Sequence, residues 1–508
     1  MTAGRLENAA VLVVGAGIMG AGIAQVAAVA GHRVWLFDSR DGAAAQAKAR
    51  LREILEGLAA KGRLGPDAAR DALARIEAAG TLEAGRDARL VIEAIVEDLE
   101  AKRALFRQLE AIVPADCVLA TNTSSISVTA LANGLAHPER LVGMHFFNPV
   151  PLMKLVEVVS GVHTQAEVAG AIFELAGHWG KVPVHARSTP GFIVNRIARP
   201  YYAETLALLQ EQAASPEVLD ACLRGAGFRM GPCELMDLIG HDTNFAVTQS
   251  VYAANFYDKR YVPSLVQREM VDGGLLGRKT GRGFYRYPDG APALPAPAPA
   301  AVTVPHVIAV HGDDSVADWL EAALRRMPAL TGRDITRRRG TGWDGLELED
   351  ARLVLTDGRC ANALSIAMGM HDVAVFDRPL ALPAPQGTSL AFATADAAGE
   401  PWRAQAAAWL AALGFAPRQV ADAPGLVVAR TVAMLINEAA DAVQQGVCTP
   451  DGADAAMKLG MNYPAGPFEW LAQWSADGVV ALLDGLDTQY RGERYRASPW
   501  LIRRLRSA

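Results

Sequence analysis

A histidine and a glutamate flank a proline-containing turn in the segment LVGMHFFNPVPLMKLVE, which ends at residue 157. The runs LVGMHFF and MKLVEVV are typical of strands, and the NPVP between them is a turn signal. Such a turn brings His145 and Glu157 together. An imidazole whose second nitrogen is bonded to a carboxylate has a fixed tautomer and can act as a general base near neutral pH. The pair is therefore either that base or a buried ion pair with a purely structural role.

A nucleotide-binding pattern begins the chain. The apolar run 9–14 leads into GAGIMGAG, a helical pattern follows to residue 30, and a second strand ends at Asp38. Glycines at G-x-G-x-x-G spacing allow a tight turn and bring backbone N–H groups close to a pyrophosphate, while the acid accepts bonds from ribose hydroxyls. The order predicts dinucleotide binding, with a turn that binds no phosphate as the alternative. The predicted cofactor residues of this turn are Gly15, Gly17, Ile18, Met19 and Gly20.

Asp38 also predicts which dinucleotide binds. Its carboxylate would repel a 2′-phosphate, so we expect NAD rather than NADP. Arg40, two residues later, is a nearby feature that favours a phosphate instead.

Polar residues follow the next two strands. The strand RLVIEAI (89–95) runs into VEDLEAK, which places Glu97 and Lys102 at or just past its carboxyl end, where ligands of such sheets bind. The strand CVLATNTSS (117–125) delivers Asn122, Ser124 and Ser125 to the same edge. Hydroxyls there can bind a substrate oxygen. The alternatives are a solvated helix start for the charged pair and helix capping for the hydroxyls.

Five segments, in this order and spacing, resemble the (S)-3-hydroxyacyl-CoA dehydrogenase family of β-oxidation over about residues 9–287. They are GAGIMGAGIAQVAAVAGHRVWLFD, VIEAIVEDLEAK, NTSS, HFFNPVPLMKLVEV and TPGFIVNR. The resemblance implies His145 as the catalytic base and Glu157 as its orienting partner, with Ser124 and Asn195 holding the 3-oxygen of the substrate. It also implies a set of NAD contacts beyond the glycine turn and Asp38. These are Glu97, Lys102, Ser124, Asn148 and Lys279.

The chemistry of such an enzyme agrees with these residue types. Oxidation of a secondary alcohol needs a base for the hydroxyl proton while a hydride leaves for the nicotinamide, and charge builds on the oxygen that becomes the ketone. Donors from Ser124 and Asn195 would stabilise that charge in the transition state. No His, Cys and Asp cluster has metal-ligand spacing, so we expect no metal site.

The segment 41–87 is longer than an ordinary crossover and has helical patterns near 43–60 and 66–79. In the family that the chain resembles, a helical pair inserted here binds coenzyme A. The resemblance implies that Lys61 contacts the CoA, as does Ser124. The alternative for Lys61 is a solvated basic helix face.

The predicted fold class is α/β: an N-terminal Rossmann NAD-binding domain, an all-α dehydrogenase C-terminal domain, and then a degenerate second copy of both. A Pro/Ala-rich stretch, PDGAPALPAPAPAAVTVP, is the strongest boundary signal and predicts a semi-rigid linker. The predicted domains are 1–188 with its insertion 41–87, the helical domain 189–287 for substrate binding and dimerisation, the linker 288–305, a degenerate Rossmann-like lobe 306–421 and a second helical domain 422–508.

The second copy follows from an internal repeat. DAPGLVVARTVAMLINEAADAV (422–443) is similar to STPGFIVNRIARPYYAETLALL (188–209), but Ala429 stands at the position of Asn195. The stretch 304–420 has strand-like runs HVIAV, RLVLTDG, DVAVFD and SLAFATA, without a G-x-G-x-x-G or an HFFNP. We interpret this half as a structural copy that makes the contacts a partner subunit makes in dimeric relatives. The protein is then a monomer with an internal pseudo-dimer, with a homodimer as the alternative.

Composition limits the class of protein. A chain of 508 residues with 51% hydrophobic residues and a net charge of -6 predicts several packed domains and argues against nucleic-acid or anionic-membrane partners. No apolar stretch has the length of a signal core or a membrane span. The five cysteines lack disulfide-like spacing, which is typical of reduced thiols in the cytoplasm.

The acyl chain of the substrate is the least determined feature. The tandem architecture resembles bacterial dehydrogenases that act on 3-hydroxyadipyl-CoA in phenylacetate catabolism, and the alternatives are 3-hydroxybutyryl-CoA or general fatty-acid substrates. Cys233 stands where relatives have an aromatic residue, which bears on chain length. Two further alternatives are another NAD-dependent hydroxyacid dehydrogenase and a non-enzymatic NAD-binding structural protein. The joint presence of Ser124, His145, Glu157 and Asn195 argues against the last.

Overall fold

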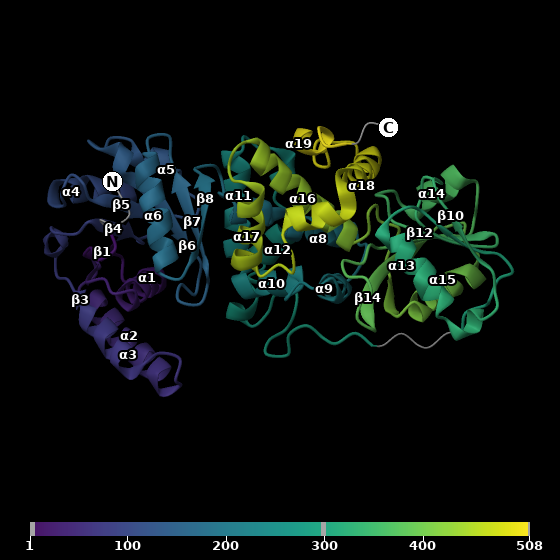
Figure 1. Cartoon of the computed structure of the whole chain (residues 1–508), viewed down its shortest axis with the longest axis horizontal. Coiled ribbons are helices and arrows are strands. Elements are labelled where there is room, and N and C mark those ends of the chain that lie inside the picture. The colour runs from purple at the N-terminus through teal and green to yellow at the C-terminus, as the bar shows by residue number, and fades with distance from the viewer. Residues whose placement is uncertain (1–5, 296–300, 506–508) are drawn as a thin grey trace. The chain divides into compact units, whose positions relative to one another are not determined.

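The computed structural model describes residues 6–295 and 301–505 of the chain. They form two compact units, the first made of 6–196 with 442–461 and the second of 197–295, 301–441 and 462–505. Figure 1 labels the elements of both. Part of the predicted linker, residues 296–300, lies outside the described residues. Within the part of the chain that is described, no helix is long and apolar enough to cross a membrane.

The first unit is built on an eight-stranded sheet in the order β3-β2-β1-β4-β5-β6-β7-β8. Its central strands are continuous apolar runs, such as VLVV in β1, because they are buried on both faces. The predicted hairpin is present, since β6 and β7 pair antiparallel with His145 opposite Glu157. The strands are β1 (Val11–Val14), β2 (Val34–Phe37), β3 (Ile76–Ala78), β4 (Leu90–Glu93), β5 (Val118–Thr121), β6 (Leu141–Phe146), β7 (Leu155–Ser160) and β8 (Val182–Arg187).

The helices of the first unit connect these strands. The two helices predicted after Asp38 are observed, and the second ends at Arg75, four residues early, because the chain joins the sheet there as β3. The helix after β4 begins at an N-cap, where the Asp98 side chain accepts the N–H of Ala101 at 2.8 Å. The helices are α1 (Ile18–Val29), α2 (Ala43–Ala60), α3 (Pro66–Arg75), α4 (Leu99–Ile112), α5 (Val128–Ala132), α6 (Ala166–His178) and α7 (Val194–Ile197).

One helix of the first unit comes from the second half of the sequence. Helix α17 (Pro450–Met461) belongs to this unit and packs on β7 and β8. A Cβ on Gly460 would lie only 2.8 Å from Cδ2 of Leu155, so glycine allows this close approach. The N–H of Arg187 donates to the carbonyl of Val447 at 2.9 Å. A helix of the second half of the sequence therefore packs against the sheet that contains the β6–β7 hairpin.

The second unit contains the helical region and a second sheet. Its helices have Pro at the first turn or a Ser or Asp N-cap in several cases, which are common helix starts. The helices include α8 (Arg199–Gln210), α9 (Pro216–Gly225), α10 (Pro232–Ile239), α11 (His241–Ala254), α12 (Leu265–Asp272), α13 (Ser315–Arg325), α14 (Ala361–Met368), α15 (Glu400–Ala412), α18 (Pro467–Tyr490) and α19 (Pro499–Ile502). Helix α16 (Val428–Gln444) begins in this unit.

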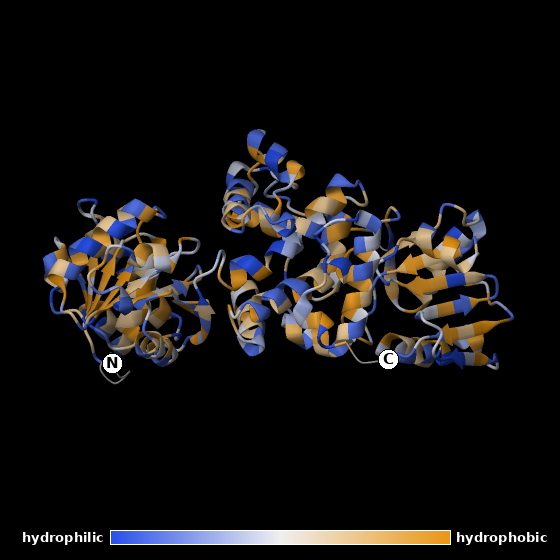
Figure 2. Cartoon of the chain, turned by 90° about the horizontal axis from the view of Figure 1, so that it is seen from above, coloured by the Kyte–Doolittle hydropathy of each residue, from blue (hydrophilic) through white to orange (hydrophobic). Residues whose placement is uncertain are grey.

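The second sheet has seven strands in the order β10-β9-β11-β12-β13-β14-β15. The four predicted runs form β9, β12, β13 and β14, whereas β10, β11 and β15 were not predicted. Strand β11 is antiparallel to both of its neighbours and joins β12 through a tight turn, so no crossover helix lies between them. Figure 2 shows the strands of both sheets largely in the hydrophobic colour. The strands are β9 (Ile308–His311), β10 (Ile335–Arg338), β11 (Gly345–Leu348), β12 (Ala351–Leu355), β13 (Val373–Phe376), β14 (Thr388–Thr394) and β15 (Phe415–Gln419).

Two buried glutamates show that the repeated helices pair reciprocally. Glu204 of the first copy accepts from Arg494 and Tyr495 of the second, at 2.7 and 3.0 Å. Glu438 of the second copy contacts Arg260 and accepts from Tyr261 of the first. Each residue of one set lies 234 positions from its counterpart in the other, so the contact has the self-complementary character of a twofold interface.

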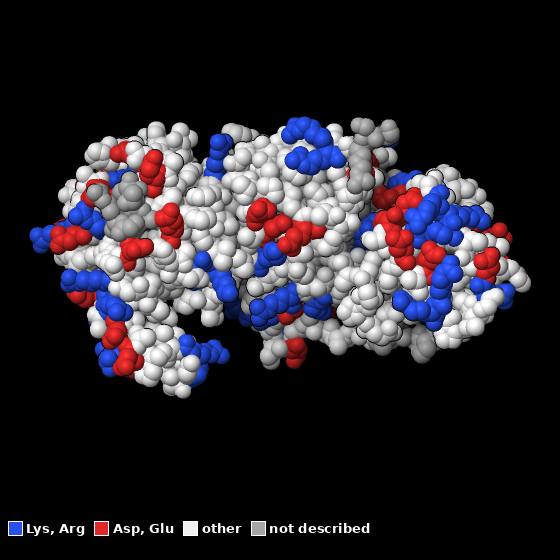
Figure 3. Space-filling model, viewed as in Figure 1, with Lys and Arg blue, Asp and Glu red and all other residues white. Residues whose placement is uncertain are grey.

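Charged side chains of both signs are interspersed over both sheet lobes on the face shown in Figure 3. Many are paired, as Arg33 with Glu77 in the first unit and Arg325 with Glu321 in the second. Among the described residues, no group of three or more His, Cys, Asp or Glu side chains is placed to bind a metal ion.

Candidate active site

The turn between β1 and α1 has the shape of a phosphate cradle. Gly15 has φ +109, and a Cβ on it would lie 2.4 Å from the carbonyl oxygen of Ala94. A Cβ on Gly20 would lie 1.8 Å from the carbonyl oxygen of Gly15, so the helix and the turn require glycine there. Gly17, by contrast, is the N-cap of α1 and faces open space, and no side chain caps this helix. The uncapped N-terminus fits a pyrophosphate.

Asp38 lies at the end of β2, beside this turn. One carboxylate oxygen accepts the N–H of Ala16 at 2.8 Å, and Arg40 bonds both oxygens. The hydrogen bond from Arg40 lowers the pKa of Asp38 to about 2. A cavity of about 630 Å³ opens here, with Asp38, Gly17 and the segment Ala94–Val96 among its walls. Its size and its acid fit the adenosine half of a dinucleotide.

His145 and Glu157 form a buried pair across the β6–β7 hairpin. The distance from Nδ1 to a carboxylate oxygen of Glu157 is 2.6 Å. The other carboxylate oxygen accepts the N–H groups of Ile193 and Val194 at 3.0 and 2.9 Å. The imidazole therefore donates from Nδ1, which leaves Nε2 as the basic nitrogen. The ring of Phe192 packs edge-on against the imidazole, with centroids 5.8 Å apart.

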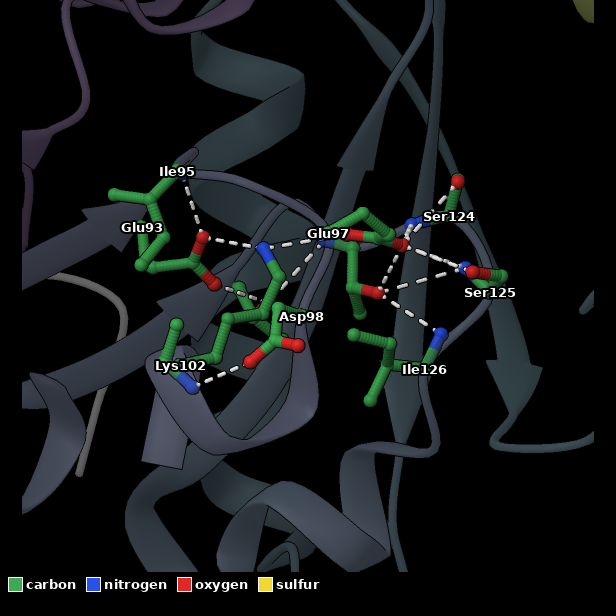
Figure 4. A network of polar contacts seen from close by, with 11 residues as sticks. Glu93, Ile95, Glu97, Asp98, Lys102, Ser124, Ser125 and Ile126 are labelled. Atoms are coloured by element: carbon green, nitrogen blue, oxygen red, sulfur yellow. Dashed lines mark hydrogen bonds and ion pairs between the residues drawn. The ribbon is translucent and has the colours of Figure 1, made fainter. Parts of the chain in front are cut away.

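Glu97 organises the turn after β5 that contains Ser124 (Figure 4). One of its oxygens accepts the hydroxyl of Thr123 at 2.6 Å and the N–H groups of Ser124 and Ser125 at 2.9 and 3.1 Å. Burial raises the pKa of Glu97, but the Thr123 hydrogen bond, the Lys102 charge and the turn N–H groups outweigh it, so the pKa is lowered. Glu97 is therefore held as a carboxylate at the strand edge.

The remaining predicted residues fall into three groups. The side-chain amide of Asn195 lies 3.5 Å from the carbonyl oxygen of Ser124, so these two are together in the first unit. Asn148 in the hairpin turn and Lys61 at the end of α2 are exposed. Lys279 belongs to the second unit, where its ammonium pairs with Asp242.

Two features of the site were not predicted from the sequence. Lys102 is 1% exposed and its ammonium pairs with Glu93, the last residue of β4. A carboxylate inside the apolar run RLVIEAI was the available signal. The contact of Asp38 with the N–H of Ala16 was also missed, because it depends on the exact turn geometry.

The second sheet lacks the equivalent groups. Asp377 follows β13 and its N–H donates to the carbonyl of Ala391, so Asp377 occupies the register position of His145 and Ala391 that of Glu157. Asp377 accepts the N–H groups of residues 427, 428 and 429, where Glu157 accepts those of 193 and 194. A carboxylate at the start of the following helix is kept, and the base is lost.

The N-terminus of α13 is closed by a side chain. Gly312, at φ +113, takes the place of Gly15, and the N-cap is Asp314 instead of Gly17. The Asp314 side chain accepts the N–H groups of Val316 and Ala317 at 2.9 and 3.1 Å, and it pairs with Arg378. The carboxylate thus satisfies the donors that a pyrophosphate would use.

The first unit therefore combines a dinucleotide cradle with a histidine–carboxylate pair, the site of an NAD-dependent alcohol dehydrogenase. The model of the 3-hydroxyacyl-CoA dehydrogenase NAD binding domain matches residues 10–189, and that of the C-terminal domain matches 191–287 and 425–507. The model of the 3-hydroxybutyryl-CoA dehydrogenase reduced Rossmann-fold domain matches 353–424. The chain belongs to the 3-hydroxyacyl-CoA dehydrogenase family and is an NAD-dependent oxidoreductase acting on 3-hydroxyacyl-CoA.

Individual relatives share the tandem arrangement or its first half. The 3-hydroxyadipyl-CoA dehydrogenase of Escherichia coli (strain K12) is 43% identical over 97% of each chain. A solved structure of 3-hydroxybutyryl-CoA dehydrogenase from Escherichia coli K12 has a TM-score of 0.88 at 42% identity and covers 98% of each chain. A probable 3-hydroxybutyryl-CoA dehydrogenase of Deinococcus radiodurans is 44% identical over 54% of this chain and 99% of its own. The family and reaction class predicted from the sequence are confirmed.

Proposed function

We propose that His145 is the base that removes the proton from the 3-hydroxyl group and that Glu157 orients it. The observation that carries this proposal is the 2.6 Å contact between Nδ1 and the Glu157 carboxylate. Glu157 is fully buried, and two backbone N–H groups fix its other oxygen, so it cannot turn away from the ring. Nε2 then takes the hydroxyl proton, and the buried carboxylate stabilises the imidazolium that forms.

Ser124 and Asn195 are proposed to hold the 3-oxygen as it becomes a ketone. The Glu97 bonds to the turn amides fix the Ser124 backbone, and the Asn195 amide lies beside that backbone. Donors that are ordered before the reaction stabilise developing negative charge without reorganising. Bound NAD would accept the hydride released from the substrate carbon.

The glycine turn and Asp38 are proposed to bind the pyrophosphate and the adenosine ribose. The uncapped helix α1 and the 630 Å³ cavity support this assignment. Met19 and Ile18 would contribute backbone at the same turn. Further proposed cofactor contacts are Glu97, Lys102, Ser124, Asn148 and Lys279, and the proposed CoA contacts are Lys61 and Ser124.

We propose 3-hydroxyadipyl-CoA, in aromatic (phenylacetate) catabolism, as the preferred substrate. The support is the Escherichia coli 3-hydroxyadipyl-CoA dehydrogenase, which matches 97% of this chain. 3-Hydroxybutyryl-CoA is the second candidate, because the similar solved structure carries that name. Initial rates of NAD reduction with 3-hydroxyadipyl-, 3-hydroxybutyryl- and a longer 3-hydroxyacyl-CoA test the order. A higher kcat/KM for 3-hydroxybutyryl-CoA than for 3-hydroxyadipyl-CoA would make the butyryl compound the preferred substrate. If none of the three compounds is oxidised, a structural NAD-binding role would be favoured.

We further propose that one chain is the working assembly. The reciprocal contacts of Glu204 and Glu438 resemble a dimer interface made within one chain, so the helical surface is already covered. Light scattering on the purified protein would distinguish a monomer from a homodimer. The free cysteines Cys117, Cys222, Cys233, Cys360 and Cys448 support a cytoplasmic, reducing compartment.

A further inference from the structure

Glu93 is a buried carboxylate to which the proposed mechanism gives no role. It ends β4 and is 0% exposed. One oxygen accepts the N–H of Ile95 at 2.8 Å and the ammonium of Lys102, and the other accepts the hydroxyl of Thr121 at 2.7 Å. Figure 4 shows it at one end of a connected polar network. Both oxygens of the Glu93 carboxylate therefore accept hydrogen bonds, at the end of β4 beside the nucleotide cavity.

Lys102 is the link between two carboxylates. Its ammonium contacts Glu93 and, at 3.3 Å, the Oε2 atom of Glu97. An ammonium that is only 1% exposed is costly unless anions surround it. Apolar side chains of similar size in place of Glu93 and Lys102 would be about as stable as this buried ion pair. Stability alone therefore does not explain why these two residues are charged.

Glu97 carries the effect to the reacting groups. Its side chain is 38% exposed, and the ammonium of Lys102 is the cation that fixes its Oε2 atom. Its Oε1 atom accepts the N–H groups of Ser124 and Ser125 and the hydroxyl of Ser125, while the Ser124 hydroxyl lies 3.3 Å away and turns from Glu97 to the substrate oxygen when it acts as a donor. The orientation of the Ser124 turn thus depends on where Lys102 holds Glu97.

We propose that Glu93 is a positioning residue for the dehydrogenation. It fixes Lys102, Lys102 fixes Glu97, and Glu97 orders the Ser124 turn at the substrate oxygen. Glu93 also holds the N–H of Ile95, in the segment Ala94–Val96 that lines the nucleotide cavity. The inference rests on the proposed role of Ser124, since the turn matters for catalysis only if its hydroxyl meets the substrate.

The first test is Glu93→Gln, which keeps the shape and removes the charge. We expect kcat to fall by about tenfold or more through loss of orientation. Hydrogen exchange of the peptide containing Ser124 and Ser125 should become faster. The matched control is Glu100→Gln on α4, the helix that also carries Lys102; the Glu100 side chain is 73% exposed and pairs with Arg103, so its replacement should change neither quantity.

A double variant separates positioning from stability. Glu93→Gln with Lys102→Met removes both buried charges, so the melting temperature should return toward that of the wild type. Glu97 still lacks its cation, so kcat should stay low and the Ser124 peptide should still exchange fast. A double variant with wild-type kcat and slow exchange would overturn the inference. If the turn loosens while kcat is unchanged, the positioning inference and the role of Ser124 both fail. Wild-type protein without turnover would overturn the proposed function alone, because the exchange result does not depend on activity.

Discussion

Glu157 uses its two oxygens for two different purposes. One receives the imidazole of His145 and the other receives the N–H groups that begin α7, the helix that carries Asn195. A single carboxylate thus fixes the imidazole of the proposed base and the start of the helix that carries the proposed amide donor. This explains why the glutamate, and not only the histidine, lies in a fully buried strand position.

Replacement of the base tests this arrangement. His145→Gln should lower kcat by about a hundred-fold or more, because no group remains to take the hydroxyl proton. NADH affinity measured by fluorescence should change little, since the glycine turn is separate from the hairpin. His137→Gln is the matched control, because His137 is half-exposed and pairs with Glu139. Turnover within a few-fold of wild type would show that His145 is not the base.

Asp38 and Arg40 together determine the expected cofactor preference. In the wild type, Arg40 bonds both carboxylate oxygens of Asp38. Asp38→Ser removes the carboxylate that repels a 2′-phosphate and releases Arg40 from this contact. The ratio of kcat/KM for NAD to that for NADP should fall by about tenfold or more. Arg40→Gln is the comparison variant and should keep the preference for NAD. Equal use of both cofactors by the wild type would contradict the assignment.

At the scale of elements, the β6–β7 hairpin could be predicted and its replacement in the second sheet could not. The strand-like runs LVGMHFF and MKLVEVV on either side of the NPVP turn predicted the pairing of His145 with Glu157. The role of Asp377 depends on sheet register and on N–H groups about fifty residues away in the sequence, which no local pattern gives. The buried pair of Glu93 with Lys102 was also missed, although the carboxylate inside the apolar run RLVIEAI was a local signal for it.

Helix α18 contains a break that was also not predicted from its sequence. Ser475 has φ 64 and ψ 160, a region that is strained for any residue but glycine. Gly240 separates α10 from α11 with φ 97 and ψ 127, at the equivalent place in the first copy. The packing of the repeated domain evidently requires the break, and the second copy makes it with serine.

The buried carboxyl group of Asp377 predicts a pH dependence of stability. Burial raises its pKa to about 6, although the N–H groups of Val428, Ala429 and Val427 oppose this. An unfolded aspartate titrates near 3.9. The folded chain therefore binds more protons between about pH 4 and 6, and the free energy of unfolding contributed by this group falls as pH rises through that range.

Asp377→Asn should remove this contribution. Urea unfolding at about pH 4.5, 5.5 and 7 should show that the free energy of unfolding of the wild type, minus that of the variant, falls as pH rises. The variant should be least stable relative to the wild type at the lowest pH. Asp350→Asn, at the exposed turn between β11 and β12, should keep the wild-type slope. Parallel pH profiles for the wild type and Asp377→Asn would contradict the prediction.

At the scale of the whole molecule, one nucleotide site per chain is expected. Asp314 fills the N-terminus of α13, whereas Gly17 leaves that of α1 open. Calorimetry should therefore give one NAD per chain. Gly17→Asp gives α1 the aspartate N-cap that α13 has. Gly17 has space for a Cβ and an ordinary φ of -71, so the variant should fold. Its carboxylate should occupy the N–H groups at the start of α1, so the variant should bind no NAD. Two NAD per chain would contradict the description of the second lobe as degenerate.

The repeated helices exchange places between the copies. Helix α17 of the second copy packs on β7 and β8 in the first unit, and α9 of the first copy packs on β14 in the second unit. This exchange could not be predicted from the sequence, because the repeat shows only that two copies exist. It means that a helix of the second half packs against the first sheet.

Removal of residues 288–508 is the sharpest test of that dependence. The truncated chain lacks α17, which packs on β7 and β8. It also lacks Arg430 and Arg494, the two cations that pair with Glu204, whose side chain is 0% exposed. A buried carboxylate that loses its cations costs about 3–5 kcal/mol, and the removal also uncovers the rings of Tyr201 and Phe228, which contact Tyr463 and Trp470. Two copies of the fragment 1–287 can replace, for each other, the contacts that the second half makes to the helical domain. Light scattering should therefore show dimers or aggregates instead of monomers. The fragment 301–508, added as a separate chain, should restore a one-to-one complex. A fragment 1–287 that stays monomeric, soluble and fully active would instead make the second half an independent module on a linker.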